Sequence, residues 1–165
     1  MSTDNLFGSV LDPNAASAWR EALRARGKRV VFTNGCFDVL HAGHVDYLAW
    51  ARAQGDALIV GLNSDASVRE LKGERRPLVP FGDRARLLTA LRSVDAVVEF
   101  AERTPEALLE RIRPDVHVKS AQYREDALPE RRVVLAHGGE IRLAPHLAGH
   151  STTDIISTIV SRYGV

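Results

Sequence analysis

Short apolar runs rich in β-branched residues alternate with helical segments along most of this sequence, and no other feature restricts the fold as strongly. Runs of about four to eight such residues are typical of strands buried on both faces of a sheet. Strands that alternate with helices form a parallel sheet, and right-handed crossovers place helices on both of its faces. We therefore predict a doubly wound α/β fold with a five-stranded parallel sheet, its strands at residues 30–34, 57–62, 96–100, 115–119 and 140–143.

Helix-start signals precede several of the segments between the strands. Asp12 and Pro13 give a carboxylate cap followed by proline at the first helical position, and Thr104 and Pro105 repeat this pattern. Ser64 and Ser151 are further capping residues of the preferred kind. Together with the apolar spacing, these signals predict helices at residues 13–26, 44–54, 64–71, 83–92, 104–112, 129–137 and 151–160.

The chain length and charge balance limit the number of domains and the kinds of partner. The 165 residues suit one domain with its own core. We expect a helical extension at residues 1–27, followed by a single α/β domain at residues 28–165. The 22 basic and 21 acidic side chains leave a formal net charge of +1. This balance argues against nucleic acid as a partner and against binding to a membrane surface.

Cysteine use and the lengths of the apolar runs bear on the compartment. Cys36 is the one cysteine, which excludes an internal disulfide framework and a four-cysteine zinc site. Residues 1–13 contain two aspartates and no apolar run, unlike a signal peptide. No apolar run approaches the ~20 residues that a membrane-spanning helix needs. We therefore expect a protein of the reducing cytoplasm.

The segment after the first predicted strand carries the strongest indication of chemistry. In doubly wound sheets, ligands bind beyond the carboxyl ends of the strands. Here His41 and His44 stand three apart at a predicted helix start, so they face the same way, and Gly43 between them lets a ligand approach the backbone. Unpaired amides at a helix start attract anions, and imidazoles donate hydrogen bonds to phosphate oxygens. The segment therefore predicts a phosphate-binding site, although it has neither a dinucleotide fingerprint nor a Walker loop.

Other interpretations of these residues remain open at this point. The histidines are simple structural residues in one of them. In a second, Cys36, His41 and His44 are zinc ligands, but no fourth ligand is apparent. Cys36 as a nucleophile lacks an assigned general base, and the thiol can equally be a packing residue.

The motif in residues 35–44 resembles that of a known superfamily. Gly35-Cys36-Phe37-Asp38 followed by His41-Ala42-Gly43-His44 is similar to the signature of the nucleotidyltransferases with an H-x-G-H motif. Further stretches resemble the adenylyltransferase domain of ADP-heptose synthase, namely residues 32–34, 51–56, 63–68, 71–77, 94–95 and 151–155. The resemblance implies a Rossmann-like nucleotidyltransferase fold for residues 28–165.

The resemblance also implies an activity. The enzyme would transfer AMP from ATP to a sugar 1-phosphate, heptose 1-phosphate in the nearest family, and release pyrophosphate, with Mg²⁺ accompanying the triphosphate. One alternative is a cytidylyltransferase that uses CTP and glycerol 3-phosphate or a related polyol phosphate. An alternative of another class is a nucleotide-binding module without turnover. Family members are often dimers, which makes a homodimer one expectation for this chain.

Particular residues inherit roles from the same resemblance. Catalysis would fall to His41, His44 and Lys72. The nucleotide would be bound by Asn34, Gly35, Cys36, Phe37, Asp38, Gly43, Lys119, Ser151, Thr152 and Thr153. The sugar phosphate would be contacted by Arg76, Arg84 and Gln122. No residue is expected to hold a resident metal ion, and Asp38 would either hold a magnesium-bound water or orient a neighbouring group.

Two of these residues also have plain structural interpretations. Lys72 lies in a basic stretch, and most such runs are solvated surface. Ser151 is well placed as a helix cap, which does not exclude a phosphate at the same helix start.

The sequence departs from the heptose family after the fourth predicted strand. That family usually has Lys-Gly-Gly-Asp-Tyr, whereas this chain has Lys119-Ser120-Ala121-Gln122-Tyr123. Serine and alanine restrict backbone angles that glycine permits, and glutamine carries no charge. Base, ribose or sugar recognition is expected to differ here, and this departure is what suggests the module without turnover.

Overall fold

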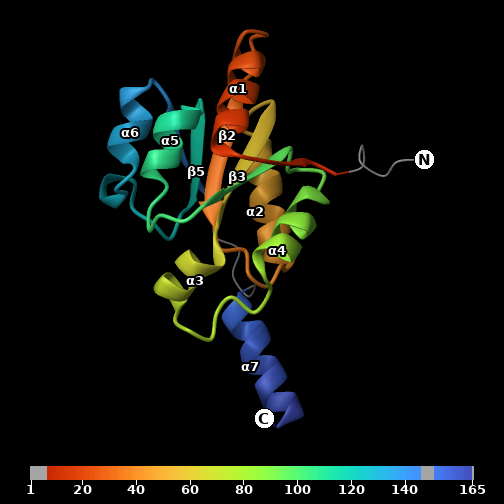
Figure 1. Ribbon diagram of the computed structural model, residues 1–165. Coiled ribbons are helices and arrows are strands. Elements are labelled where there is room, and N and C mark those ends of the chain that lie inside the picture. Colours follow the sequence, from red (N-terminus) through yellow and green to blue (C-terminus); the bar gives the residue numbers. More distant parts are fainter. Residues whose placement is uncertain (1–6, 146–150, 165) are drawn as a thin grey trace, which may run out of the picture.

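Six parallel strands form one sheet in the computed structural model, which describes residues 7–145 and 151–164 (Figure 1). The order across the sheet is β1-β4-β3-β2-β5-β6, and every pairing is parallel. The strands are β1 Ser9–Leu11, β2 Val30–Gly35, β3 Ala57–Asn63, β4 Ala96–Phe100, β5 Val116–Ser120 and β6 Glu140–Ala144. The predicted doubly wound parallel sheet is confirmed, with one strand more than the five predicted.

The extra strand, β1, lies at the edge of the sheet against β4. Its register runs from Ser9 opposite Ala96 to Leu11 opposite Val98, and Gly8 before it donates a backbone hydrogen bond to Thr89 at 2.8 Å. The strand has only three residues, two of them exposed. It therefore lacks the buried apolar run by which the other five strands were predicted.

The helices lie close to the predicted positions. They are α1 Pro13–Arg24, α2 Ala42–Arg52, α3 Asp65–Lys72, α4 Phe81–Thr89, α5 Glu106–Ile112, α6 Arg131–Ala136 and α7 Thr152–Tyr163, with a 3-10 turn η2 at Glu125–Ala127. Of these, α1, α4, α5 and α6 are shorter than predicted and α7 is longer. No helix in this described part of the chain is long and apolar enough to cross a membrane.

Three predicted helix caps are present and one is not. Asp12 accepts hydrogen bonds from the amides of Asn14 and Ala15 at 2.8 and 2.9 Å. Ser64 and Ser151 each accept from the amide three residues on, at 3.2 and 3.1 Å. The predicted Thr104 cap is wrong, because its hydroxyl donates to the side chain of Glu106 and α5 begins only at that residue.

Helices cover both faces of the sheet, as predicted. Successive strand residues contribute to opposite faces, so Val31 and Val97 lie in one core cluster and Val30 and Val98 in the other. The first cluster is closed by residues of α2 and α4, and the second by residues of α1, α5 and α6. Figure 1 shows α7 projecting from one end of the sheet, on the same side as α3.

The strand order at the centre of the sheet indicates where a ligand would bind. β2 pairs with β3 from Val30 opposite Ala57 to Gly35 opposite Leu62, and on its other side with β5. The chain moves outward from β2 in both directions, so the strand order reverses between β2 and β5. Ligands of doubly wound sheets bind beyond the carboxyl ends of the strands at such a switch point.

Candidate active site

Two adjoining cavities, of about 410 and 570 Å³, open beyond the carboxyl ends of β2 and β5. Their volumes are in the range of small-molecule sites. Residues from β2, α2, α3, β5 and α7 line both of them, including Asn34, Phe37, His44, Lys72, Lys119 and Thr152. The structure thus brings together the majority of the residues predicted to bind nucleotide, from segments far apart in the sequence.

The two histidines form a stacked pair at the start of α2. His41 is the N-cap residue of the helix, and its ring centroid lies 3.8 Å from that of His44 with the planes inclined by 23°. Both rings line the smaller cavity. The edge of the Phe37 ring packs on His44, with 5.1 Å between centroids. The prediction that the two imidazoles face the same way is confirmed.

Burial keeps His44 neutral before any ligand binds. Desolvation, followed by the nearby charge of His41, lowers the pKa of His44 to about 4. Its Nδ1 is buried and has no hydrogen-bond partner among the described residues. A phosphate group placed beside the ring would raise this pKa again, because an anion favours the charged imidazolium.

The backbone after β2 turns sharply to present these groups. Phe37 adopts a φ of +43°, a left-handed conformation that is uncommon for a residue with a side chain. This turn places its ring against Gly35, where an added Cβ would lie 3.0 Å from the ring. Gly35 is therefore needed so that the ring of Phe37 can reach His44.

Asp38 ties the histidine segment to the loop before α4. Its buried carboxylate accepts hydrogen bonds from the amides of Leu78 and Val79, at 2.7 and 2.8 Å, and forms an ion pair with Arg76. Burial alone would raise the pKa of Asp38, but the two amides and Arg76 lower it below its usual value. Asp38 lines the larger cavity, yet its oxygens already have protein partners.

Arg84 is a buried structural residue. Its guanidinium has no exposure and donates to the carbonyl oxygens of Cys36, Asn63 and Val79 at 2.7, 3.0 and 2.9 Å. It also pairs with Asp65 at 2.6 Å. It lines neither cavity. Four of its five N–H donors already bind the protein, which argues against the predicted contact between Arg84 and the sugar phosphate.

Cys36 lines both cavities but has neither metal-site nor nucleophile geometry. No group of three histidine, cysteine or acidic side chains that could hold a metal ion exists within residues 7–145 and 151–164. The thiol lies 3.9 Å from Oδ1 of Asn63. Burial raises the pKa of Cys36, which keeps it a thiol at neutral pH.

The remaining predicted residues surround the cavities. Lys72 is the exposed last residue of α3, and it lines both cavities. Ser151 caps α7 and also lines the smaller cavity, so its two predicted roles are compatible. Thr153 reaches only the larger cavity. Gln122 is exposed and lines the smaller one, and Gly43 does so too.

Several lining residues carry no signal in the sequence. Tyr47 lines the smaller cavity, and its hydroxyl lies 2.7 Å from Oγ1 of Thr33 and donates to the Val118 carbonyl at 3.1 Å. Arg103 and Glu130 line the larger cavity. These residues stand outside any motif and reach the site through the sheet topology.

The strand order that reverses at β2 and the paired histidines at a helix start are typical of nucleotide-binding α/β proteins. The chain belongs to the cytidylyltransferase-like family, which it matches over residues 32–159. The predicted membership of the nucleotidyltransferases is thereby confirmed. Among named relatives, the bifunctional protein HldE of Geobacter sulfurreducens is 54% identical over 143 residues. HldE of Halorhodospira halophila is 50% identical over 155 residues.

These relatives are much longer than this chain. The matched residues cover 87% of this chain but 29% of the Geobacter protein, and 94% of this chain but 32% of the Halorhodospira protein. A solved structure of the lipopolysaccharide core biosynthesis protein from Thermoplasma volcanium superposes with a TM-score of 0.61 at 24% identity, covering 73% of this chain and 98% of that one. This last likeness concerns the fold alone.

Proposed function

We propose that this protein is an adenylyltransferase that joins AMP from ATP to a sugar 1-phosphate, heptose 1-phosphate, and releases pyrophosphate. A phosphate oxygen of the sugar attacks the α-phosphorus, and the bond from that phosphorus to the bridging oxygen of the β-phosphate breaks. The attacking oxygen is already ionised at neutral pH, so the site needs no strong base. It has to align the two substrates and neutralise charge.

The observation that carries the proposal is the stacked pair of His41 and His44, which lines a cavity at the start of α2. Lys72 and Lys119 line the same cavity from two other elements. Four nitrogen donors on three elements suit a triphosphate, whose charge spreads over many oxygens. Ser151, at the start of α7, offers a second helix N-terminus for the terminal phosphates.

Magnesium enters this proposal as part of the nucleotide substrate. The acidic residues that line the described cavities are Asp38 and Glu130, and protein donors already engage both carboxylates. Mg²⁺ keeps several waters and is commonly bound through substrate phosphates. We propose that it arrives on the triphosphate, where it neutralises charge on the leaving pyrophosphate.

A second candidate is transfer of CMP from CTP, which the description of the matched family favours. The experiment that separates the candidates measures pyrophosphate release with Mg²⁺ and each triphosphate in turn. Each is offered heptose 1-phosphate and glycerol 3-phosphate. Release with ATP and heptose 1-phosphate is expected. Release only with CTP supports the second candidate, and nucleotide binding without release for any pair supports a binding module.

The role of the histidine pair is tested in the same assay. His44→Ala is expected to lower kcat by about 10²–10³-fold, the usual loss on removing one donor to a transition-state oxygen. His137→Ala is the matched control, because His137 pairs with Glu110 and neither residue lines either cavity. A His44→Ala enzyme with the rate of the control would remove the histidines from the proposal.

We further propose that the protein is cytoplasmic and that it forms a homodimer. The exposed apolar side chains of Ile159, Val160 and Tyr163 on α7 support a second copy as partner. Sedimentation equilibrium measures the mass directly, and a monomer at all concentrations would contradict the dimer.

A further inference from the structure

A buried glutamate in the lining of the larger cavity has no task in the proposed reaction. Glu130 stands immediately before α6 and is 2% exposed. One of its oxygens, Oε1, lies 3.1 Å from Nζ of Lys119 and 3.2 Å from Nε2 of His117. Both partners belong to β5. A buried carboxylate at the start of α6 therefore contacts two residues of β5, and one of them, Lys119, lines both cavities.

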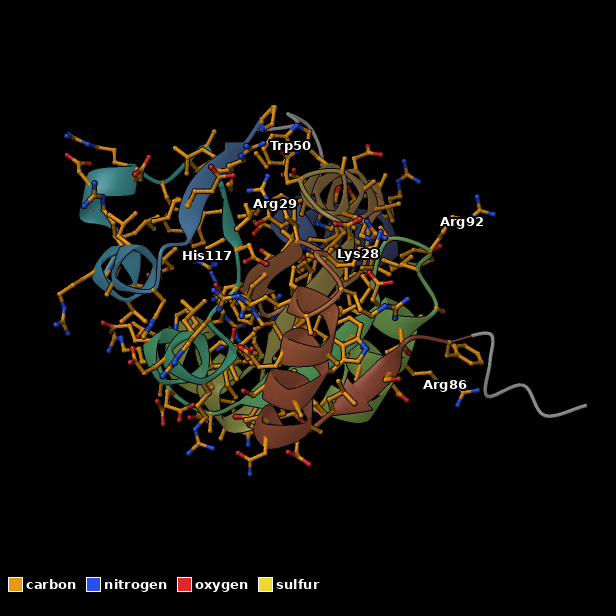
Figure 2. All side chains as sticks on the ribbon, turned by 90° about the horizontal axis from the view of Figure 1, so that it is seen from above. Lys28, Arg29, Trp50, Arg86, Arg92 and His117 are labelled. Carbon is orange, nitrogen blue, oxygen red and sulfur yellow. The ribbon has the colours of Figure 1, made fainter. Side chains whose placement is uncertain are left out.

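The charge states of this cluster follow from its burial. His117 is completely buried, and Figure 2 shows it in the interior, away from peripheral side chains such as Arg86. Desolvation lowers the pKa of His117, so the ring is neutral and donates to the carboxylate from Nε2. Burial would raise the pKa of Glu130, but His117 and Lys119 lower it to about 2. The carboxylate is thus ionised at working pH.

The ammonium of Lys119 is held from two sides. Its Nζ donates to Oδ1 of Asn34 at 3.2 Å as well as pairing with Glu130. It also lies 5.1 Å from the centre of the Tyr123 ring. A lysine ammonium has three donors, so one hydrogen bond and one ion pair leave a donor for a ligand. A lysine held in this way is oriented before any ligand binds, whereas most lysines are flexible.

We propose that Glu130 is a positioning residue for nucleotide transfer, which fixes Nζ of Lys119 at the point where it binds a phosphate oxygen of the triphosphate. His117 in turn fixes the carboxylate by its hydrogen bond. The inference rests on the proposed function, since it takes the cavity to be the triphosphate site. Glu130 itself does not touch the substrate.

A double-mutant cycle on ATP tests this. Glu130→Gln keeps the size and an acceptor oxygen but removes the charge that holds the ammonium. We expect it to lower kcat/KM for ATP about tenfold, within the usual range of coupling energies for residues in contact. The KM for the sugar phosphate should change less than about twofold. In a Lys119→Met background, Glu130→Gln should have almost no further effect.

Glu125→Gln is the matched control, because it removes the same charge from a residue of the neighbouring turn η2. The side chain of Glu125 is 45% exposed. Thermal unfolding of each variant shows whether it is folded, and Kd for MgATP from calorimetry gives a readout that needs no turnover. Equal effects of Glu130→Gln with and without Lys119 would overturn the proposal while leaving the proposed function intact. A wild-type protein that binds no nucleoside triphosphate would overturn both.

Discussion

Replacing Arg84 by methionine tests the interpretation that a buried cation holds three segments of the site together. Methionine approximates the length of arginine and fills the space, so the change removes the hydrogen bonds and the charge while leaving little cavity. The carbonyl oxygens of Cys36, Asn63 and Val79 lose a donor, and Asp65 loses its ion pair.

The expected cost follows from the number and burial of these bonds. A hydrogen bond to a charged group contributes about 1.5–3 kcal/mol, and such contributions within one cluster do not add fully. Removing one partner of a buried ion pair costs about 3–5 kcal/mol. Asp65 keeps 33% of its side chain exposed and recovers part of its solvation, which places the loss near the lower end of that range. We expect Arg84→Met to lower the free energy of unfolding by about 3–4 kcal/mol.

Urea titration followed by far-UV circular dichroism measures this loss directly. For a domain of this size, the same loss lowers Tm by about 6–16 °C. Arg86→Met is the matched control from the same helix, because Arg86 is exposed and lies over the Phe7 ring at 5.3 Å (Figure 2). That substitution should cost less than about 1 kcal/mol. If the two variants unfold within 1 kcal/mol of each other, the buried guanidinium does not stabilise the segments it connects.

Three other results are expected. Gly61→Ala places a Cβ 2.6 Å from Cζ of Phe32 and should destabilise the fold by about 1–3 kcal/mol in urea, whereas Gly82→Ala meets no atom within 4 Å and should not. His44 is neutral, with a pKa of about 4, and a bound anion raises that pKa. The affinity for ATP should therefore rise as the pH falls from 8 to 6, and calorimetry should detect proton uptake on binding. A binding enthalpy that does not depend on the buffer would contradict this. The pKa of Asp38 is lowered in the folded protein, so its contribution to the free energy of unfolding is present above the normal carboxyl range and is lost in acid. Asp38→Asn should lower the free energy of unfolding by about 1.5–3 kcal/mol at pH 7 and make that free energy less dependent on pH in the acid range.

Local signals account for the part of the fold that the sequence predicts. Buried β-branched runs identify five strands, and side-chain caps such as Asp12 identify helix starts, because both depend on residues close together in the chain. The sixth strand, β1, owes its existence to pairing with β4, which lies more than eighty residues further along. Only the folded sheet provides that partner.

The residues of the candidate site also fall into two groups, those that the local sequence predicts and those that only the folded chain brings together. His41 and His44 are predicted because their spacing and the helix start lie within one segment. Arg84 resembles a solvated helix residue by type, yet it shares a face with Leu88, four residues on, and both are buried. Three of its four acceptors lie on residues 36, 63 and 65, at least 19 residues away in the sequence, so the local pattern does not predict these contacts. Glu130 is likewise placed by the approach of α6 to β5.

The cationic side chains around the cavities are of two kinds: some are paired with carboxylates of the protein, and others keep their charge available for a ligand. Arg76 is paired with Asp38, Arg84 with Asp65 and Lys119 with Glu130, so each is largely neutralised by a carboxylate. Lys72, by contrast, has no ion pair within the described ranges and lies exposed at the end of α3. On the proposed function, a triphosphate therefore meets its least compensated charge at Lys72, and the neutral ring of His44 takes up a proton only when the anion arrives. Such a site attracts the nucleotide from the outer side while its inner side stays fixed, as a transfer between two phosphates requires.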